Sequence, residues 1–386
     1  MRSVCLILVA TLLPNVAFAQ PDPAPSDAPA PATDPPASDP VTAVPPVAPT
    51  ASTSTPVSTS TTPTGGSVTG KYSGIGVSPP GHWRVIVSDL SILRVNPIGI
   101  ETRARIGLQK RLYASQKPIS QNNFMFLGAY PKLNPASAHL ALGGEFQPAS
   151  IFNLKANVEI QKYFGSFGFL QSFTTPHANY SDQTLKDLED VPGFEPQSAT
   201  AFHAALHPML QLKLGKIAVR SLFQIDYWDF KLRDGDTVAY EATYDTLLPD
   251  KGFTLATDTD VLFVGKPGLA VGLRHTWVKP LYKQKHFADP DLSAMENSDE
   301  LERFGSNNGH QRLGLFAAYT LHDRGPSRFN KPTVIVIASW YLDHEYRTGA
   351  PDAMGPDQRP DDFTSRAFPY LLVGFAFESD FAKPPR

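Results

Sequence analysis

The stretch IGIETRARIGLQKRL, residues Ile98 to Leu112, separates its side chains by parity. The even positions carry Ile, Thr, Ala, Leu and one Lys, whereas the odd positions carry Gly, Glu, Gln and three Arg. Successive side chains of a β-strand point to opposite faces. The stretch therefore predicts a strand with one apolar face and one charged face.

The same alternation recurs along the chain and predicts an all-β fold. Residues 334–337 are apolar at both parities, so this run also suits a strand buried on both faces. Residues 240–248 fit either a hairpin within a loop or two additional strands. We therefore expect twelve strands, within a range of ten to fourteen. The predicted strands are residues 83–94, 98–112, 122–132, 136–147, 152–161, 202–214, 217–227, 253–263, 269–277, 313–321, 333–346 and 371–381.

The lengths of the connections favour a single antiparallel transmembrane barrel. Four connections are long and polar, and the others are short. If the N-terminal segment lies in the periplasm, a barrel of twelve strands places all four long connections on the outer side. An even strand number with short inner turns and long outer loops is typical of bacterial outer-membrane barrels. The long connections are residues 165–198, 231–252, 282–308 and 347–365.

Residues 1–19 have the features of a secretory signal peptide. Arg2 supplies a positive charge, Val4–Leu13 supply an apolar core, and Ala17-Phe18-Ala19 fits cleavage before residue 20. The apolar core is too short to cross a membrane as a helix. The alternative is an amphipathic N-terminal helix of a soluble protein. The only cysteine, Cys5, lies in this segment, so the mature chain has no thiol for a disulfide or a nucleophile.

Residues 20–70 predict a disordered linker. Thirteen prolines lie between Pro21 and Pro63, and the segment has no Lys, Arg or aromatic residue. Such a segment cannot bury enough apolar surface to offset its chain entropy. We interpret it as a tether or spacer, with binding to peptidoglycan or to a periplasmic partner as the alternative. Residues 71–386 then form the barrel.

The charge balance argues against nucleic-acid binding. Of the 34 basic and 37 acidic residues, one and four respectively precede residue 71, which leaves 33 of each in the barrel region. A balanced charge gives no basic patch for nucleic acid. The sequence also has no Gly-rich phosphate loop or dinucleotide motif, so we expect no cofactor.

A water-soluble β-sandwich is the alternative fold, because its strands alternate in the same way. The predicted strands, however, are longer than the usual five or six residues. Aromatic residues also lie near the strand ends, as they do in the interfacial girdles of membrane barrels. These residues are Trp83, Tyr113, Tyr163, Tyr227, Trp228, Trp277, Tyr346 and Phe381.

The last predicted strand is amphipathic and aromatic, with Phe375, Phe377 and Phe381 on one face. With the signal peptide and the alternating segments, it resembles the outer-membrane β-barrel superfamily of Gram-negative bacteria. The resemblance implies that this strand is an assembly signal for the barrel-assembly machinery, and that lipid and lipopolysaccharide surround the barrel. The chain departs from the pattern by continuing through residues 382–386. The superfamily includes pores, transporters, adhesins, lipid enzymes and scaffolds, so membership does not determine function.

The charged face of the strands predicts a polar lumen. Mixed charges on neighbouring strands can form ion pairs across the sheet. The first hypothesis is a small porin-like channel for polar solutes, in which the arginines favour anions. The second is a closed scaffold barrel that is filled by the same side chains and binds a partner through its loops. The predicted pore-lining residues are Glu101, Arg103, Arg105, Arg111, Glu145, Lys155, Glu159, Lys213, Arg220, Asp226, Asp258, Asp260 and Arg274.

The sequence offers weak candidates for a metal site and for catalysis. His203 and His207 share a strand face but lie about 13 Å apart along the backbone, so we do not expect them to bind one metal ion. In Asp343-His344-Glu345 the two acids point away from the histidine. A lipid-modifying enzyme is the third hypothesis, with Ser221 and His275 on the apolar face, but no nucleophile-elbow motif accompanies them. We predict neither catalytic residues nor metal ligands.

Overall fold

The computed structural model describes residues 81–115, 117–166, 170–287, 308–323, 328–347 and 369–381. The predicted signal peptide, the predicted linker and residues 382–386 lie outside this part of the chain. Within it, no helix has the length and apolar composition needed to cross a bilayer.

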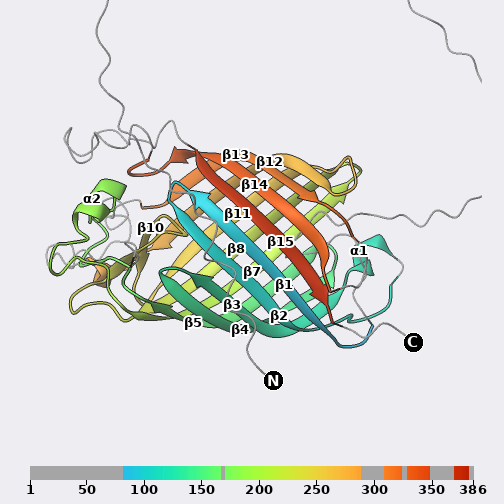
Figure 1. The fold of residues 1–386 in the computed structure, drawn as a ribbon, viewed down its shortest axis with the longest axis horizontal. Coiled ribbons are helices and arrows are strands. Elements are labelled where there is room, and N and C mark those ends of the chain that lie inside the picture. Colours follow the sequence, from blue (N-terminus) through green and yellow to red (C-terminus); the bar gives the residue numbers. More distant parts are fainter. Residues whose placement is uncertain are drawn as a thin grey trace, which may run out of the picture. The chain divides into compact units, whose positions relative to one another are not determined.

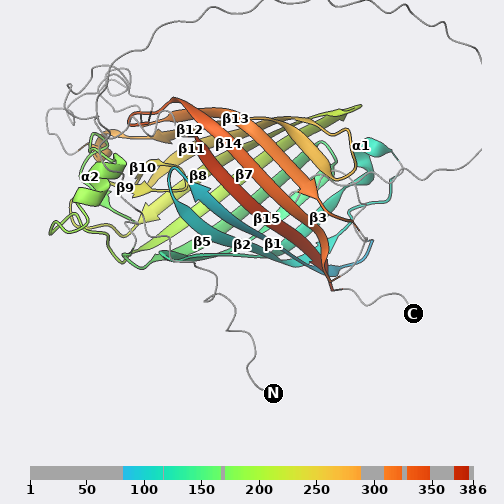
Figure 2. The ribbon, with the colours of Figure 1, turned by 45° about the horizontal axis from the view of Figure 1, so that its top comes forward.

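Twelve antiparallel strands form a closed barrel, as the alternation predicts (Figures 1 and 2). Each strand pairs with its neighbours along the chain, and β1 closes the barrel by pairing with β15 through residues 86–95 and 371–380. The strands are β1 (Arg84–Val95), β2 (Gly99–Lys110), β3 (Phe124–Asn134), β4 (Ser137–Ala149), β5 (Phe152–Tyr163), β7 (Thr200–Leu214), β8 (Ile217–Phe230), β11 (Gly252–Phe263), β12 (Leu269–Leu281), β13 (His310–Thr320), β14 (Asn330–Asp343) and β15 (Tyr370–Asp380).

The apolar faces of the strands point out of the barrel. On β4 and β5 the side chains of Leu142 and Ile160 are 58% and 63% exposed, whereas Ala141 and Glu159 are buried. A water-soluble sandwich would bury its apolar faces between two sheets. The exposed apolar exterior and the closed sheet exclude the sandwich and place lipid against the outer surface.

Strand β14 is a barrel strand like the others. Val334 and Val336 point outward and are exposed, and Ile335 and Ile337 point into the lumen. The interpretation of this run as a strand buried on both faces is therefore wrong. Its apolar residues at both parities instead give the barrel an apolar exterior and an apolar stretch of lumen wall at the same place.

A second, smaller sheet lies in the long connections. It contains β6 (Ser172–Phe173), β9 (Val238–Glu241) and β10 (Thr246–Pro249), in the order β10-β9-β6. Residues 240–248 are thus a hairpin within a loop and add no strands to the barrel. All residues of β9 and β10 are buried. We call this sheet the plug sheet.

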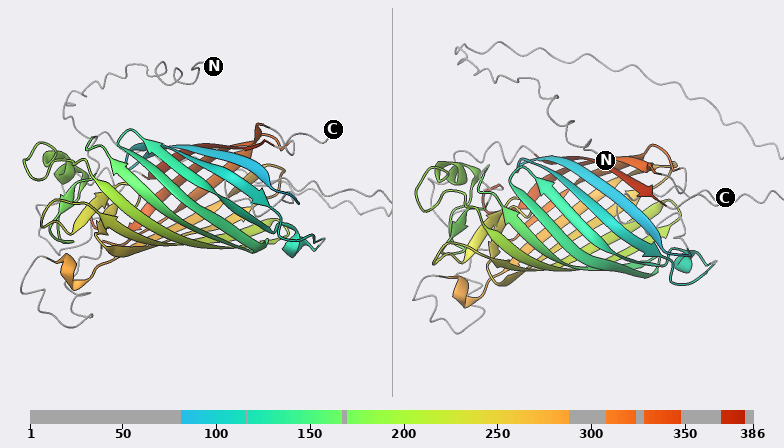
Figure 3. Two further views of the ribbon diagram at one scale, coloured as in Figure 1. Left: turned by 90° about the horizontal axis from the view of Figure 1, so that it is seen from below. Right: turned by 60° about the horizontal axis from the view of Figure 1, so that its bottom comes forward.

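The short helices mark the two ends of the barrel (Figure 3). Helix α2 (Asp182–Asp187) lies with β9 and β10 at one end, which we call the loop end. Helix α1 (Pro118–Gln121) lies at the other, which we call the turn end (Figure 1). A 3₁₀ turn, η1 (Gln284–His286), follows β12.

The lipid-facing exterior can be tested with two substitutions of the same chemistry. We expect Leu142→Arg, in the middle of β4, to lower the free energy of unfolding by about 2–4 kcal/mol, because a cation near the middle of a bilayer is costly. Leu214→Arg, at the last residue of β7, should cost only about 0–1 kcal/mol. Urea unfolding in phospholipid vesicles measures both, and equal costs at the two positions would contradict the lipid-facing assignment.

Candidate functional site

The barrel lumen contains a cavity of about 300 Å³. Strands from all sides of the barrel contribute to its wall, together with residues of the turn between β9 and β10. Cations outnumber acids in the lining by seven to four, so the cavity carries a positive excess. The cations are Arg94, Arg103, Lys132, Lys155, Arg220, Arg274 and Arg312, and the acids are Glu101, Glu159, Glu241 and Asp258.

The thirteen residues expected to line a pore divide into three groups. Seven line the cavity, namely Glu101, Arg103, Lys155, Glu159, Arg220, Asp258 and Arg274. Four are buried in hydrogen-bonded networks of the wall, namely Arg105, Glu145, Asp226 and Asp260. Arg111 follows β2, Lys213 is exposed at the end of β7, and neither lines the cavity.

A row of three charges crosses β8, β11 and β12. Asp260 lies opposite Arg220 on one side and Arg274 on the other. Arg274 donates from Nε and Nη2 to the two carboxylate oxygens at 2.6 and 2.9 Å, and Arg220 Nε donates at 2.9 Å. One fully buried carboxylate thus holds two guanidinium groups by charge-assisted hydrogen bonds. Asp258 lies 3.8 Å from Arg274 Nη1, so two acids balance the two cations on this part of the wall.

A second network fills the lumen beside β2, β3 and β4. Arg105 donates to both oxygens of Glu145, at 2.9 and 3.2 Å, and its guanidinium lies 3.5 Å from the centre of the Phe126 ring. Tyr130 donates to the same carboxylate. Arg105 and Glu145 satisfy one another behind the cavity wall, where they stabilise it, and Tyr130 connects them to the cavity.

Asp226 on β8 connects two histidines to the plug sheet. The Nε2 atoms of His203 and His207 lie 2.8 and 2.9 Å from Asp226 Oδ1, and the Tyr244 hydroxyl donates to Oδ2 at 2.8 Å. The histidine rings therefore converge much more closely than their backbone spacing of about 13 Å indicates, because both side chains lean toward β8. Among the described residues there is no group of three or more potential ligands that could hold a metal ion.

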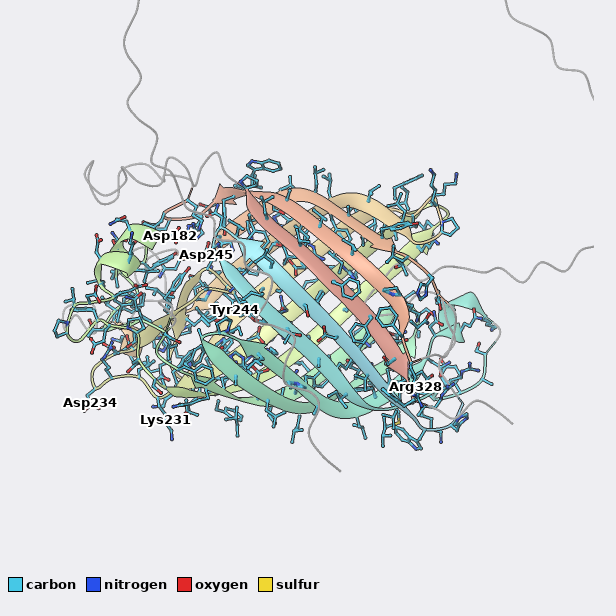
Figure 4. All side chains as sticks on the ribbon, viewed as in Figure 1. Asp182, Lys231, Asp234, Tyr244, Asp245 and Arg328 are labelled. Carbon is cyan, nitrogen blue, oxygen red and sulfur yellow. The ribbon has the colours of Figure 1, made fainter. Side chains whose placement is uncertain are left out.

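The turn between β9 and β10 enters the lumen from the loop end. Glu241 accepts hydrogen bonds from the backbone N–H groups of Thr243 and Tyr244, at 2.7 and 3.0 Å, which shapes the turn. Glu241, Thr243 and Tyr244 all line the cavity, and Tyr244 lies inside the barrel in Figure 4. The plug sheet therefore narrows the lumen at this end.

An ionic cluster, which we call the latch, holds the plug sheet, with Arg347 and Asp245 buried and Asp182 exposed. Arg347, just after β14, donates to both oxygens of Asp245, at 2.6 and 3.0 Å, and to both oxygens of Asp182, at 2.9 Å. The hydroxyls of Tyr240 and Tyr341 also donate to Asp245. Asp182 and Asp245, labelled in Figure 4, lie close to one another at the loop end.

Charge controls the protonation of the latch. Burial by itself would raise the pKa of Asp245, but the positive charge of Arg347 holds that pKa well below its usual range. Burial would lower the pKa of Arg347, and Asp245 raises it well above its usual value. Both groups are therefore ionised at neutral pH.

The candidate catalytic pair lies on the outer surface without a mutual hydrogen bond. Ser221, Thr259 and His275 form one row across β8, β11 and β12, so a whole strand separates the serine from the histidine. Ser221 bonds Thr259 at 2.8 Å, and His275 Nε2 lies 3.2 Å from Gln311 Oε1. This arrangement provides no base in contact with the serine hydroxyl.

The terminal strand β15 carries its phenylalanines on the exterior. Phe375 and Phe381 are exposed, Phe377 is partly exposed, and the three share one parity. The backbone N–H of Phe381 donates to Val85 on β1 at 3.1 Å. This face is therefore presented to lipid next to the seam that closes the barrel.

A closed antiparallel barrel with an apolar exterior and a largely polar interior is an outer-membrane β-barrel protein.

No family model and no curated protein matches the chain. Among solved structures the chain is similar to the KdgM porin, at 9% identity and a TM-score of 0.34, over 77% of this chain and 100% of that chain. It is similar to the NanC porin at 5% identity and a TM-score of 0.33, over 75% of this chain and 98% of that chain. It is also similar to the translocator domain of autotransporter NalP from Neisseria meningitidis. Here the identity is 10% and the TM-score 0.31, over 78% of this chain and 89% of that chain. The fold assignment rests on the strand pairing of this chain.

Sequence reasoning missed several residues of the lumen. Arg94 and Arg312 have the inward parity of their strands, so the alternation itself contains a signal for their position in the lumen. Tyr244 and Arg347 lie in connections without periodicity, so no pattern in the sequence indicates that they meet Asp226 and Asp245.

The latch predicts how the plug sheet is released. We expect Arg347→Ala to expose the backbone amides of residues 238–249 to hydrogen exchange, because removing one partner of a buried ion pair costs about 3–5 kcal/mol. Arg233→Ala is the matched control at the loop end, because Arg233 contacts the half-exposed Glu195 and such pairs contribute about 0–1 kcal/mol. Unchanged exchange in Arg347→Ala would contradict the latch.

The latch also predicts the response of the plug sheet to acid. A lowered folded-state pKa stabilises the fold above the unfolded pKa of about 3.9, and this stabilisation is lost as the pH falls through the folded value. Protection of residues 238–249 should therefore be the same at pH 7 and pH 5. A loss of protection between these pH values would show that another group controls the plug sheet.

Proposed function

We propose that this protein is a small porin-like channel for polar solutes, with a preference for anions. One observation carries the proposal: the lumen holds a cavity in which seven cationic and four acidic side chains meet. Fixed charges around a narrow passage favour permeation by ions of the opposite sign. In the proposed pathway, a solute passes through the cavity and then between the barrel wall and Tyr244 of the turn between β9 and β10.

The size of the barrel supports a narrow channel. Eight strands give an interior that side chains fill, and sixteen or more leave a wide aqueous channel. Twelve strands lie between these limits. The plug sheet then reduces the opening at the loop end, so we expect a low conductance.

A closed scaffold barrel is the second candidate, and the latch is the observation that favours it. Arg347, Asp245 and Asp182 hold the plug sheet in the loop end by paired hydrogen bonds. If these contacts never open, the lumen does not conduct, and the function lies in the surface loops. Electrical measurements separate the two candidates.

The proposal includes the parts of the chain that adjoin the barrel. Residues 1–19 would direct export, and residues 20–70 would be a periplasmic tether or would bind peptidoglycan or another periplasmic partner. Outer-membrane lipid and lipopolysaccharide would surround the barrel. The Phe375, Phe377 and Phe381 face of β15 would bind the barrel-assembly machinery. The proposed channel is not an enzyme, in keeping with the separation of Ser221 from His275.

Planar-bilayer recording tests the channel. The purified, folded protein should give discrete current steps, and a KCl gradient should give a reversal potential toward the equilibrium potential of chloride, because the cavity lining has a positive excess. Heat-modifiable migration in gels confirms that the protein measured is folded. A folded preparation without current steps would rule out the channel and leave the scaffold.

The plug sheet predicts a gain of conductance. Tyr244→Ala removes a ring from the lumen and the hydrogen bond to Asp226, so the single-channel conductance should rise. The control is Tyr319→Ala, which removes an exposed ring from the exterior of β13 and should leave the conductance unchanged. Equal conductance in the two variants would place the narrowest part of the pathway elsewhere.

A further inference from the structure

Three buried cations of the lumen have no carboxylate partner among the residues that the structure describes. Arg94, Lys155 and Arg312 line the cavity, and each is more than nine-tenths buried. Among the described residues no carboxylate oxygen lies within 4.0 Å of their charged groups, whereas the other four cations of the cavity each have one. The Nε of Arg312 also lacks any hydrogen-bond acceptor there. A buried cation without a counter-ion is costly.

Aromatic rings partly stabilise the charges of two of these cations, Arg312 and Lys155. The guanidinium of Arg312 lies 4.0 Å from the centre of the Tyr370 ring, and the ammonium of Lys155 lies 4.0 Å from that of Tyr130. A ring face attracts a cation, but it gives the N–H groups no oxygen acceptor. An anion in the cavity would supply both the charge and the acceptors.

The cavity also has an apolar side, which we call the lumen patch. It consists of Leu90, Ile92, Phe316, Ile335, Ile337 and Leu372, all of which line the cavity. Gly374 joins its two parts, since a Cβ at that position would lie 3.4 Å from both Leu90 and Ile92 and 3.6 Å from Ile335. The interior of a membrane barrel is ordinarily polar. A continuous apolar surface inside the lumen is in contact with water unless an apolar group covers it, and covering it is favourable.

The strand register places two of the cations at the border of the lumen patch. Arg94 lies opposite Leu372 on β15, and Leu372 lies opposite Ile337 on β14. Arg312 stacks on Tyr370, which is two residues before Leu372 and on the same face of β15. Lys155 on β5 lies five strands from β13 in the barrel order, across the lumen.

We infer that the cavity binds an amphipathic organic anion, a carboxylate attached to an aliphatic chain or ring. The carboxylate would accept hydrogen bonds from Arg312 and Arg94, and the apolar part would cover the lumen patch. A cavity of about 300 Å³ lies at the small end of ligand pockets, so the ligand is small. The inference deepens the proposed channel function and rests on it, because the ligand enters through the lumen.

Octanoate is the probe, and acetate and octanamide are its controls. Acetate has the charge without the chain, and octanamide has the chain without the charge. Equilibrium binding is measured by calorimetry on the folded protein in vesicles, with empty vesicles as the blank. Octanoate should bind at least about tenfold more tightly than either control, because only octanoate offers both the charge-assisted hydrogen bonds and apolar contact. Equal binding of octanoate and acetate, or of octanoate and octanamide, overturns the inference.

Variants assign the binding to the cavity. Arg312→Gln should weaken octanoate binding about tenfold or more, and Arg312→Lys, which keeps the charge, should weaken it less. Leu372→Gln should reduce octanoate binding toward the level of acetate. Lys213→Gln removes an exposed charge of the same sign outside the cavity and should change nothing. Unchanged binding in both Arg312→Gln and Leu372→Gln overturns the inference.

Conductance recorded on the same preparations separates this inference from the proposed channel. A protein that conducts but does not bind octanoate overturns the ligand site and leaves the channel. A protein that binds octanoate with the expected dependence on Arg312 but never conducts supports the ligand site and overturns the channel.

Discussion

The pairing of β1 with β15 is the constraint on which the rest of the molecule depends. Lipid offers no partner to a backbone N–H or C=O group, so a sheet that spans a membrane cannot keep a free edge. Ten residue pairs join these two strands, and the closed sheet then separates two environments. Once it is closed, the parity of each residue determines whether its side chain meets lipid or the lumen.

The fixed register then determines the electrostatics of the lumen. Asp260 meets Arg220 and Arg274 because the three residues lie in one row of paired strands. The remaining cations differ in how fully they are paired: Lys132 reaches Glu159 at 2.9 Å, whereas Arg94, Lys155 and Arg312 face the cavity. The positive excess thus arises from the few cations that have no carboxylate partner within the described part of a chain whose barrel region has equal numbers of basic and acidic residues.

The sequence predicts the strands well because their pattern is local, whereas it predicts the site poorly because the contacts are distant. Parity, together with the lengths of the connections, located all twelve strands. It also placed Arg220, Asp260 and Arg274 on the lumen face, but not in one row. The latch joins Arg347 to Asp245 across 102 positions, in connections that have no periodicity. The lumen patch combines residues of β1 with residues of β13, β14 and β15, and β1 joins these strands only when the barrel closes. No local pattern in the sequence therefore predicts the complete patch. His203 and His207 show a further limit, since backbone spacing ignores the reach of two side chains that lean toward one carboxylate.

Two of the contacts that attach the plug sheet to the barrel differ in their chemistry. In one, Arg347 grips Asp245 through charge; in the other, the Tyr244 hydroxyl reaches Asp226 through a single neutral donor. The two attachments differ in strength, since charge-assisted bidentate hydrogen bonds exceed a single bond with a neutral donor. Tyr244 and Asp245 are adjacent residues, so both contacts hold the same turn of the plug sheet. The turn that lines the cavity is thus fixed by two contacts of different strength, so its position in the lumen does not depend on either contact alone.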